Sequence, residues 1–130
     1  MTGSVGIVLV SHSAELAAGL RELLLQVGGQ SLAVEAAGGT DEGGIGTSYD
    51  LVRAAIEKAD GGAGVLVIPD LGSSVLTARV VLDDRPAPDV VIVDAPFVEG
   101  AMAAAVIAGT GADLAAAVAA AEEARDVRKL

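Results

Sequence analysis

Four short apolar runs alternate with helical patterns along this chain, and this alternation restricts the fold more than any other feature. The runs cover residues 5–10, 32–36, 65–68 and 90–93, and they consist mainly of Val, Leu, Ile and Ala, with Glu35 as their single charged residue. Between them, apolar residues recur at helical spacing, for example over residues 14–27. Continuous apolar strands are typical of a parallel sheet that helices cover on both faces. Repeated strand–helix–strand units cross over right-handed, so we expect all four strands to run parallel.

The expected helices fill the gaps between these runs and the stretch after the last one. They are placed at residues 14–27, from near Thr47, from residues 72–74 to about Leu82, from Pro96, and at residues 113–125. Thr47 and Asp50 have the spacing of a capping box, which predicts the start of the second helix. A chain of 130 residues can bury one sizeable core, so we expect a single domain over residues 1–130.

The Ala-rich stretch at residues 100–121 has only one charged residue, Asp113. A membrane span needs about 20 strongly apolar residues. This stretch is mostly Ala, and Gly109-Thr110-Gly111 interrupts it. Two short packed helices are therefore the better interpretation, and we expect no contact with a membrane.

The charge of the chain is strongly negative, with 8 Lys and Arg against 18 Asp and Glu and a formal net charge of −10. Nucleic acids and anionic lipids are bound by basic surfaces, so this charge argues against both as partners. It is compatible with a protein partner that carries a basic patch.

The chain has no Cys and a single His. Disulfides, thiolate chemistry, thiolate zinc sites and His-cluster metal sites are thereby excluded, and we expect neither a metal nor a directly bound cofactor. The N-terminus shows no basic stretch followed by an apolar core, which predicts a cytoplasmic protein without a signal peptide.

The single histidine, His12, follows the first apolar run and lies between Ser11 and Ser13. Ligands of open parallel sheets bind outside the carboxyl ends of the strands, so this turn is a candidate site. A neutral imidazole has a nitrogen lone pair, which makes His12 the candidate nucleophile. Asp70 follows the third run and could accept the imidazole N–H, which would fix the tautomer and orient the ring.

Other turns at the same expected edge carry groups suited to phosphate. Gly72, Ser73 and Ser74 open a helix, where free backbone N–H groups bind anions. Similar donors are expected in the Gly-rich loop at Gly39, Thr40, Asp41 and Thr47. Neither segment has the Gly-Lys-Ser/Thr ending of a Walker A motif, so the chain is not an obvious nucleotide binder. These groups around His12 predict a phosphohistidine carrier.

Five short motifs occur in one order along nearly the whole chain. They are Val8–Ser13, Ala36–Asp41, Ile45–Ser48, Asp70–Ser73 and Val93–Gly100. Together they resemble the phosphotransfer subunit of the phosphoenolpyruvate-dependent dihydroxyacetone kinase, which belongs to the mannose-type enzyme IIA group of the phosphotransferase system.

The resemblance implies a fold, a reaction and partners. The fold is a three-layer α/β/α sandwich around a mainly parallel sheet of four or five strands, in a homodimer. His12 would accept a phosphoryl group from the HPr phosphocarrier protein, on the ring nitrogen farther from the backbone. It would pass the group to ADP held on the ADP-binding dihydroxyacetone kinase subunit. Asp70 falls where relatives place the carboxylate that orients the histidine.

Two other interpretations use the same sheet edge. A receiver-like domain would be phosphorylated on Asp70, although receivers need an acidic pair after the first strand and this chain has Ser11-His12 there. A non-catalytic interaction module would use the edge only to bind a partner. Replacement of His12 without effect on partner binding or pathway flux favours the module.

Overall fold

The four apolar runs form one parallel sheet in the order β2-β1-β3-β4. The strands are β1 (Gly6–Ser11), β2 (Ala33–Gly38), β3 (Val65–Pro69) and β4 (Val90–Ile92). The computed structural model describes residues 4–130, so residues 1–3 of the expected domain lie outside the described residues. Within the described part the sheet has four strands, and β1 pairs with β2 on one side and β3 on the other.

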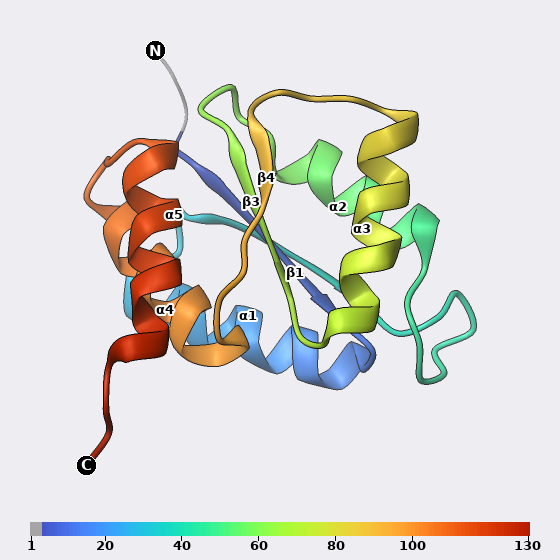
Figure 1. Ribbon diagram of the computed structural model, residues 1–130, viewed down its shortest axis with the longest axis horizontal. Helices are drawn as coiled ribbons and strands as arrows, with labels where there is room; N and C mark the ends of the chain where they lie inside the picture. The colour runs from blue at the N-terminus through green and yellow to red at the C-terminus, as the bar shows by residue number, and fades with distance from the viewer. Residues whose placement is uncertain (1–3) are drawn as a thin grey trace.

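Five helices cover the two faces of the sheet (Figure 1). They are α1 (Ala14–Gly28), α2 (Tyr49–Ala59), α3 (Gly72–Asp84), α4 (Phe97–Gly109) and α5 (Leu114–Glu123), with a final 3₁₀ turn at Ala124–Asp126. Helices α1, α4 and α5 pack on one face, and α2 and α3 pack on the other. The expected three-layer α/β/α sandwich around a parallel sheet is confirmed.

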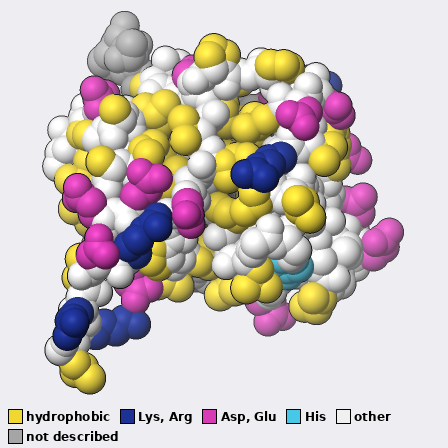
Figure 2. Space-filling view, viewed as in Figure 1, with side chains coloured by type: hydrophobic (Ala, Val, Ile, Leu, Met, Phe, Trp, Pro, Cys, Tyr) yellow, Lys and Arg dark blue, Asp and Glu magenta, His cyan; other side chains and the backbone are white. Residues whose placement is uncertain are grey.

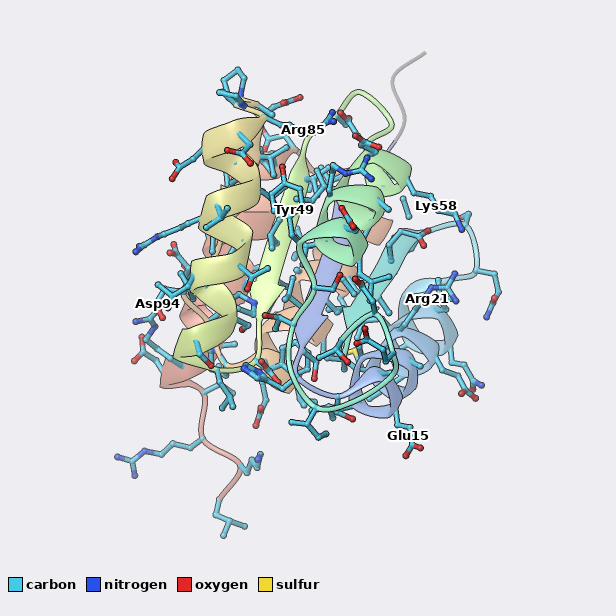
Figure 3. The ribbon with its side chains drawn as sticks, turned by 90° about the vertical axis from the view of Figure 1, so that its right-hand side faces the viewer. Glu15, Arg21, Tyr49, Lys58, Arg85 and Asp94 are labelled. Atoms are coloured by element: carbon cyan, nitrogen blue, oxygen red, sulfur yellow. The ribbon has the colours of Figure 1, made fainter. Side chains whose placement is uncertain are left out.

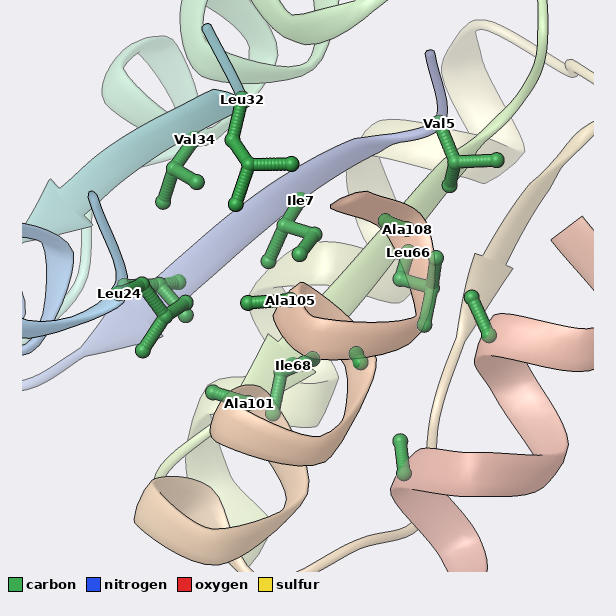
Figure 4. Close-up of a cluster of buried hydrophobic side chains, with 14 of the residues drawn as sticks. Val5, Ile7, Leu24, Leu32, Val34, Leu66, Ile68, Ala101, Ala105 and Ala108 are labelled. Atoms are coloured by element: carbon green, nitrogen blue, oxygen red, sulfur yellow. The ribbon is translucent and has the colours of Figure 1, made fainter. Parts of the chain in front are cut away.

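Successive residues of β1 supply two separate cores, because side chains alternate between the faces of a strand. Ile7 and Leu9 pack against α1, α4 and α5, and Val8 and Val10 pack against α2 and α3. Helix α4 meets the first of these cores through four buried alanines, of which Ala101, Ala105 and Ala108 are labelled in Figure 4. Their small side chains let the helix lie close to the strands.

The second helix starts later than the sequence predicts, and the expected capping box is wrong. Helix α2 begins at Tyr49, and the hydroxyl of Ser48, not Thr47, accepts the N–H of Leu51 at 3.2 Å. The reason is that Thr47 is held in the preceding loop, where its hydroxyl lies 2.6 Å from that of Thr77 on α3.

The Ala-rich stretch forms two helices, α4 and α5, joined by a turn at residues 110–113, as expected. Among residues 4–130, no helix combines the length and the apolar character that crossing a membrane requires.

Candidate functional site

The site lies where β1 and β3 end side by side. The chain leaves β1 toward β2 on one side of the sheet and later returns to β3 on the other, so this point is the topological switch of the sheet, where α/β proteins bind ligands. His12 follows β1 and Asp70 follows β3. Val10 lies opposite Pro69 in the ladder, and the N–H of Asp70 donates to the carbonyl of Val10 at 2.9 Å. Strand pairing therefore brings the two residues together.

The Asp70 carboxylate binds the imidazole and the backbone of His12. Its Oδ1 lies 3.0 Å from Nδ1 of His12, and its Oδ2 accepts the backbone N–H of His12 at 3.0 Å. The hydroxyl of Ser11 donates to Oδ2 at 3.0 Å, and the N–H of Leu71 donates to Oδ1 at 2.7 Å. Four donors from both strand ends thus hold this carboxylate in one orientation.

These contacts determine the charge of Asp70 and the tautomer of His12. Burial raises the pKa of the Asp70 carboxyl, but the hydrogen bonds from the His12 backbone, the His12 ring, Ser11 and Leu71 outweigh burial and leave the pKa below its ordinary value of 3.8. An ionised carboxylate only accepts hydrogen bonds, so Nδ1 of His12 carries the hydrogen that is shared with Oδ1. The lone pair of the neutral ring is then on Nε2.

Nε2 of His12 faces the beginning of helix α3. The hydroxyl of Ser73 lies 2.7 Å from Nε2, and since Nε2 carries the lone pair, the hydroxyl is the donor. Ser73 is exposed, whereas the His12 side chain is 22% exposed and that of Asp70 only 9%. Figure 2 shows part of the histidine at the surface, between hydrophobic and neutral neighbours. The ring is therefore reachable from solvent on its Nε2 side.

The first turn of α3 presents backbone donors at the same place. Gly72 and Ser73 are its first two residues, and the N–H groups of a first helical turn have no partner within the helix. Ser74 is buried, and its hydroxyl donates to the carbonyl of Leu71 at 2.7 Å, inside the turn. Of the three residues predicted here, Ser73 contacts the imidazole through its side chain, and Ser74 is engaged in the turn itself.

The Gly-rich loop between β2 and α2 lies against His12 through its backbone. The N–H of Gly46 donates to the carbonyl of His12 at 2.9 Å, and the N–H of Gly39 donates to the carbonyl of Ser11 at 3.0 Å. Gly39 has a φ of +78°, in the left-handed region that favours glycine. The backbone of the loop therefore supports Ser11 and His12, which lie shortly before α1.

The three polar side chains of this loop that the sequence predicts as phosphate contacts are engaged within the loop or with α3. The hydroxyl of Thr40 accepts the N–H of Gly44 at 2.9 Å, and the carboxylate of Asp41 accepts the hydroxyl of Ser48 at 2.5 Å. Thr47 contacts Thr77, as described above. None of these bonds involves the imidazole, so the assignment of Thr40, Asp41 and Thr47 to phosphate binding stays a prediction.

Ser11 was not among the site residues predicted from the sequence. It is fully buried at the end of β1, donates to Asp70 and accepts the N–H of Ser13 at 3.0 Å. Its signal in the sequence is a hydroxyl at the end of an otherwise apolar buried strand, because a buried polar side chain needs partners. Ser11 thus connects the turn that carries His12 to the carboxylate.

With this geometry established, comparison with known proteins identifies the family. The family described as "PTS system fructose IIA component" (EIIA-man) matches residues 6–118. The chain belongs to the EIIA-man family. The matched range includes both strands and all the side chains that meet at the imidazole.

Two relatives of similar length are named as DhaM subunits of dihydroxyacetone kinases. A Listeria innocua protein, "PEP-dependent dihydroxyacetone kinase 2, phosphoryl donor subunit DhaM", is 34% identical over 105 residues, which cover 78% of this chain and 84% of that protein. A Lactococcus lactis protein, "PTS-dependent dihydroxyacetone kinase, phosphotransferase subunit DhaM", is 37% identical over 107 residues, covering 82% and 85%. The resemblance that the motifs predicted is confirmed.

A longer relative and a solved structure extend the comparison. The Escherichia coli "PEP-dependent dihydroxyacetone kinase, phosphoryl donor subunit DhaM" is 39% identical over 116 residues, which cover 85% of this chain but 25% of that protein. The crystal structure of EF1359, a protein of unknown function, superposes with a TM-score of 0.83 at 33% identity and covers 92% of this chain and 94% of its own. This EIIA-man chain therefore shares its whole architecture with a solved protein.

Proposed function

We propose that this protein is a phosphohistidine carrier that receives a phosphoryl group on Nε2 of His12 and passes it to a dihydroxyacetone kinase. The observation that carries the proposal is the contact between Nδ1 of His12 and Asp70 at 3.0 Å, which leaves the lone pair on the outward nitrogen. The names of its relatives, phosphoryl donor and phosphotransferase subunits of dihydroxyacetone kinases, support the same role. The donor in the proposal is the HPr phosphocarrier protein, itself phosphorylated on a histidine.

The first transfer needs no net movement of a proton. The lone pair of Nε2 attacks phosphorus while the N–P bond of the donor histidine breaks, and the donor nitrogen takes back that electron pair. Nδ1 of His12 keeps its hydrogen throughout and donates a hydrogen bond to Asp70, and the carboxylate stabilises the positive charge of the substituted ring. Such a transfer depends on in-line positioning and charge stabilisation, not on covalent help.

The second transfer reverses these roles at the same nitrogen. A terminal oxygen of the β-phosphate of ADP, held on the ADP-binding dihydroxyacetone kinase subunit, forms a P–O bond. The N–P bond breaks and its electron pair returns to Nε2 of His12. No cofactor bound to this chain takes part in either step of the proposal.

Phosphoryl oxygens would be held by the beginning of α3. For the transfer, the hydroxyl of Ser73 leaves Nε2 and donates to a phosphoryl oxygen, beside the backbone N–H groups of Gly72 and Ser73. The positive end of the α3 dipole adds to this stabilisation. Gly39, Thr40, Asp41, Thr47 and Ser74 remain in the proposal as further predicted phosphate contacts.

Phosphorylation of Asp70 is the less favoured alternative. Both oxygens of this carboxylate accept hydrogen bonds, and its side chain is only 9% exposed, so an incoming phosphorus would meet it less readily than Nε2.

We also propose that the protein acts in the cytoplasm as a homodimer, where a soluble phosphocarrier could reach it. Light scattering at several protein concentrations would measure the oligomeric state.

The test is phosphoryl transfer in a reconstituted system. Radiolabelled phosphoenolpyruvate, enzyme I and HPr are mixed with the wild-type chain or with the His12→Gln or His12→Ala variant. We expect label on the wild type and none on either variant, although both variants unfold at temperatures close to that of the wild type. The label should be lost in acid and be stable in alkali.

Other outcomes would exclude the proposal. A labelled His12→Gln variant would mean that the acceptor is elsewhere, and loss of the label in alkali would point to Asp70. If the His12 variants still support dihydroxyacetone phosphorylation at the wild-type rate, the site is an interaction surface without a phosphohistidine.

A further inference from the structure

A pair of hydroxyls joins two segments that both contact His12. Thr47 belongs to the Gly-rich loop and Thr77 to helix α3, and their Oγ1 atoms are 2.6 Å apart although the residues are 30 positions apart in the sequence. Both residues are half-buried. We call Thr47 and Thr77 the threonine pair. It connects the loop after β2 to the helix after β3.

The loop side of the pair is fixed to the backbone of His12. Thr47 follows Gly46, whose N–H donates to the His12 carbonyl at 2.9 Å. It precedes Ser48, which is buried and caps helix α2. Thr47 therefore lies between two anchored residues, and its hydroxyl has a defined position relative to the turn that carries the imidazole.

The helix side of the pair lies about one turn beyond Ser73. Ser73 and Thr77 are four residues apart, and residues at this spacing share a face of a helix. The hydroxyl of Ser73 lies 2.7 Å from Nε2 of His12. A shift of α3 at Thr77 would therefore move Ser73, and with it the backbone N–H groups of the first turn, relative to Nε2.

The hydrophobic core restrains α3 less than a row of large side chains would. The buried residues of this helix are Ser74, Ala78 and Val81, whereas α1 buries three leucines. Dispersion contacts add up with the number of buried atoms, so small side chains hold a helix less firmly than Leu does. A polar contact such as the threonine pair has correspondingly more influence on where α3 lies.

We propose that Thr77 is a positioning residue for phosphoryl transfer, which acts through its bond to Thr47. The pair holds α3 at the separation from His12 at which Ser73 and the free N–H groups of the first turn meet the phosphoryl oxygens. Neither threonine touches the reacting atoms in this role, so the pair affects the rate through geometry alone. This inference rests on the proposed function. Direct contact of Thr47 with the phosphoryl group is the competing role, and the test separates the two.

The experiment removes the bond from each side and from both. Thr77→Val, Thr47→Val and the double variant lose a hydroxyl but keep the shape of the side chain, and Thr77→Ser keeps the hydroxyl. The matched control is Thr110→Val, because the Thr110 hydroxyl donates to the Ile107 carbonyl at the same distance, 2.6 Å, in the exposed turn after α4. Thermal unfolding shows whether each variant is folded, and Thr47→Val tests the same bond if Thr77→Val does not fold.

Two measurements are made on every variant. One is the maximal rate of labelling, with phosphorylated HPr and its KM and separately with phosphoramidate, a small donor that releases ammonia as it phosphorylates imidazole. The other is the ¹⁵N chemical shift of Nε2 of His12 in the unphosphorylated protein, which responds to the hydrogen bond from Ser73. The chemical shift needs no phosphoryl transfer, so it reports on the position of α3 independently of the proposed function.

We expect Thr77→Val and Thr47→Val each to lower the maximal rate about five- to tenfold with either donor, with a KM for HPr within about twofold of the wild type. The double variant should be no slower than either single variant, because both substitutions remove the same bond. Thr77→Ser should keep most of the rate, and Thr110→Val should match the wild type. The Nε2 shift should change in the Val variants of the pair and stay constant in the other two.

A wild-type rate in Thr77→Val would overturn the inference, and so would a slower rate with an unchanged Nε2 shift. A loss in Thr47→Val alone would overturn it by assigning Thr47 to the phosphoryl group. An equal loss in Thr77→Ser would overturn it by showing that the methyl group matters and not the bond. If HPr does not label the wild type, the proposed function fails and the inference fails with it. If HPr labels the wild type and Thr77→Val equally, only the positioning role is excluded.

Discussion

At the carboxyl end of the sheet, polar side chains bond across neighbouring strands, whereas at the amino end the polar side chains make exposed contacts that join two helices, as Arg85 and Glu57 do, or close a turn. Ser11, His12, Asp70 and Ser73 come from the ends of two strands and the start of a helix, and all four are linked. At the other end, the Asp60 carboxylate accepts an N–H from only two residues away, at 2.9 Å. Figure 3 shows the two ends, with Arg85 near one and Glu15 near the other.

The comparison teaches how a simple repeating fold restricts chemistry to one edge. A bond that crosses strands fixes the relative position of two side chains, so a change there alters the geometry of a third. A bond that closes a local turn affects only the stability of that turn. Matched substitutions at the two ends should therefore separate effects on transfer from effects on folding.

The largest difference in labelling rate and in stability is expected between the variants Asp70→Asn and Asp60→Asn. The Asp70 variant loses the acceptor that orients the imidazole, so labelling by HPr should slow on the order of 100-fold. Its free energy of unfolding should fall by about 1.5–3 kcal/mol, because the carboxylate accepts several hydrogen bonds. Asp60→Asn should change stability by about 0.5 kcal/mol or less and leave labelling unchanged. An unchanged rate in Asp70→Asn would remove this carboxylate from the mechanism.

A second pair tests close packing at the carboxyl end against backbone conformation at the amino end. A Cβ at Gly38 would lie 2.5 Å from the carbonyl oxygen of Ser13, so Gly38→Ala should displace the turn that carries His12. We expect a loss of about 1–3 kcal/mol and a labelling rate reduced several-fold. Gly62 has a φ of +96° and open space around it, so Gly62→Ala should cost about 1–2 kcal/mol without affecting transfer.

If the two glycine variants behaved alike, the two ends of the sheet would not differ in their influence on transfer. Denaturant unfolding gives the stability of each, and labelling under conditions where both are folded gives the rate. A slowed Gly62→Ala variant would show that the amino end also influences the imidazole.

A smaller effect is expected for Ser11→Ala. The substitution removes one of the four donors to Asp70 and the acceptor for the N–H of Ser13. We expect a loss of about 1–2 kcal/mol and a few-fold slower transfer, since the His12 ring contact remains. Ser11→Thr should retain most of the rate if the hydroxyl is what matters, and stability and rate measured in both variants test this.

The smallest effect is a pH dependence. The folded protein lowers the pKa of Asp70 below 3.8, so the stabilisation from this carboxylate is present above pH 3.8 and is lost as the pH falls through the lowered pKa. The difference in unfolding free energy between wild type and Asp70→Asn should therefore shrink on acidification through this range. A difference that stays constant would contradict the assignment of the shift to the folded site.

The fold could be predicted from the sequence because its signals are local and agree with one another. Runs rich in Val, Leu and Ile predict buried strands, and the glycines at residues 28–29 and 61–62 lie within a residue or two of the ends of the preceding helices. The helix that begins at Tyr49 was predicted near its observed start, but its capping residue was predicted one position early. Gly46 and Thr47 are held by His12 and Thr77, which are distant in the sequence.

The site could be predicted only as a set of turns at one edge. That His12 and Asp70 come close follows from the topology of a parallel sheet, which the sequence indicates. The bond from Ser73 to Nε2 and the position of Ser11 depend on where α3 begins and on the register of β1 with β3. A local pattern can mark Ser11 as a buried hydroxyl that needs partners, but it does not say which partners, so these contacts required the structure.

The register between Val10 and Pro69 has a thermal consequence. The separation of the reactive ring from its carboxylate is set by the spacing of two central strands, which are the last elements to open when such a domain is heated. The capacity for transfer should therefore persist until global melting begins, and it should be lost together with the secondary structure. A heated sample that remained folded but had lost its capacity to be labelled would indicate a site that depends on its loops.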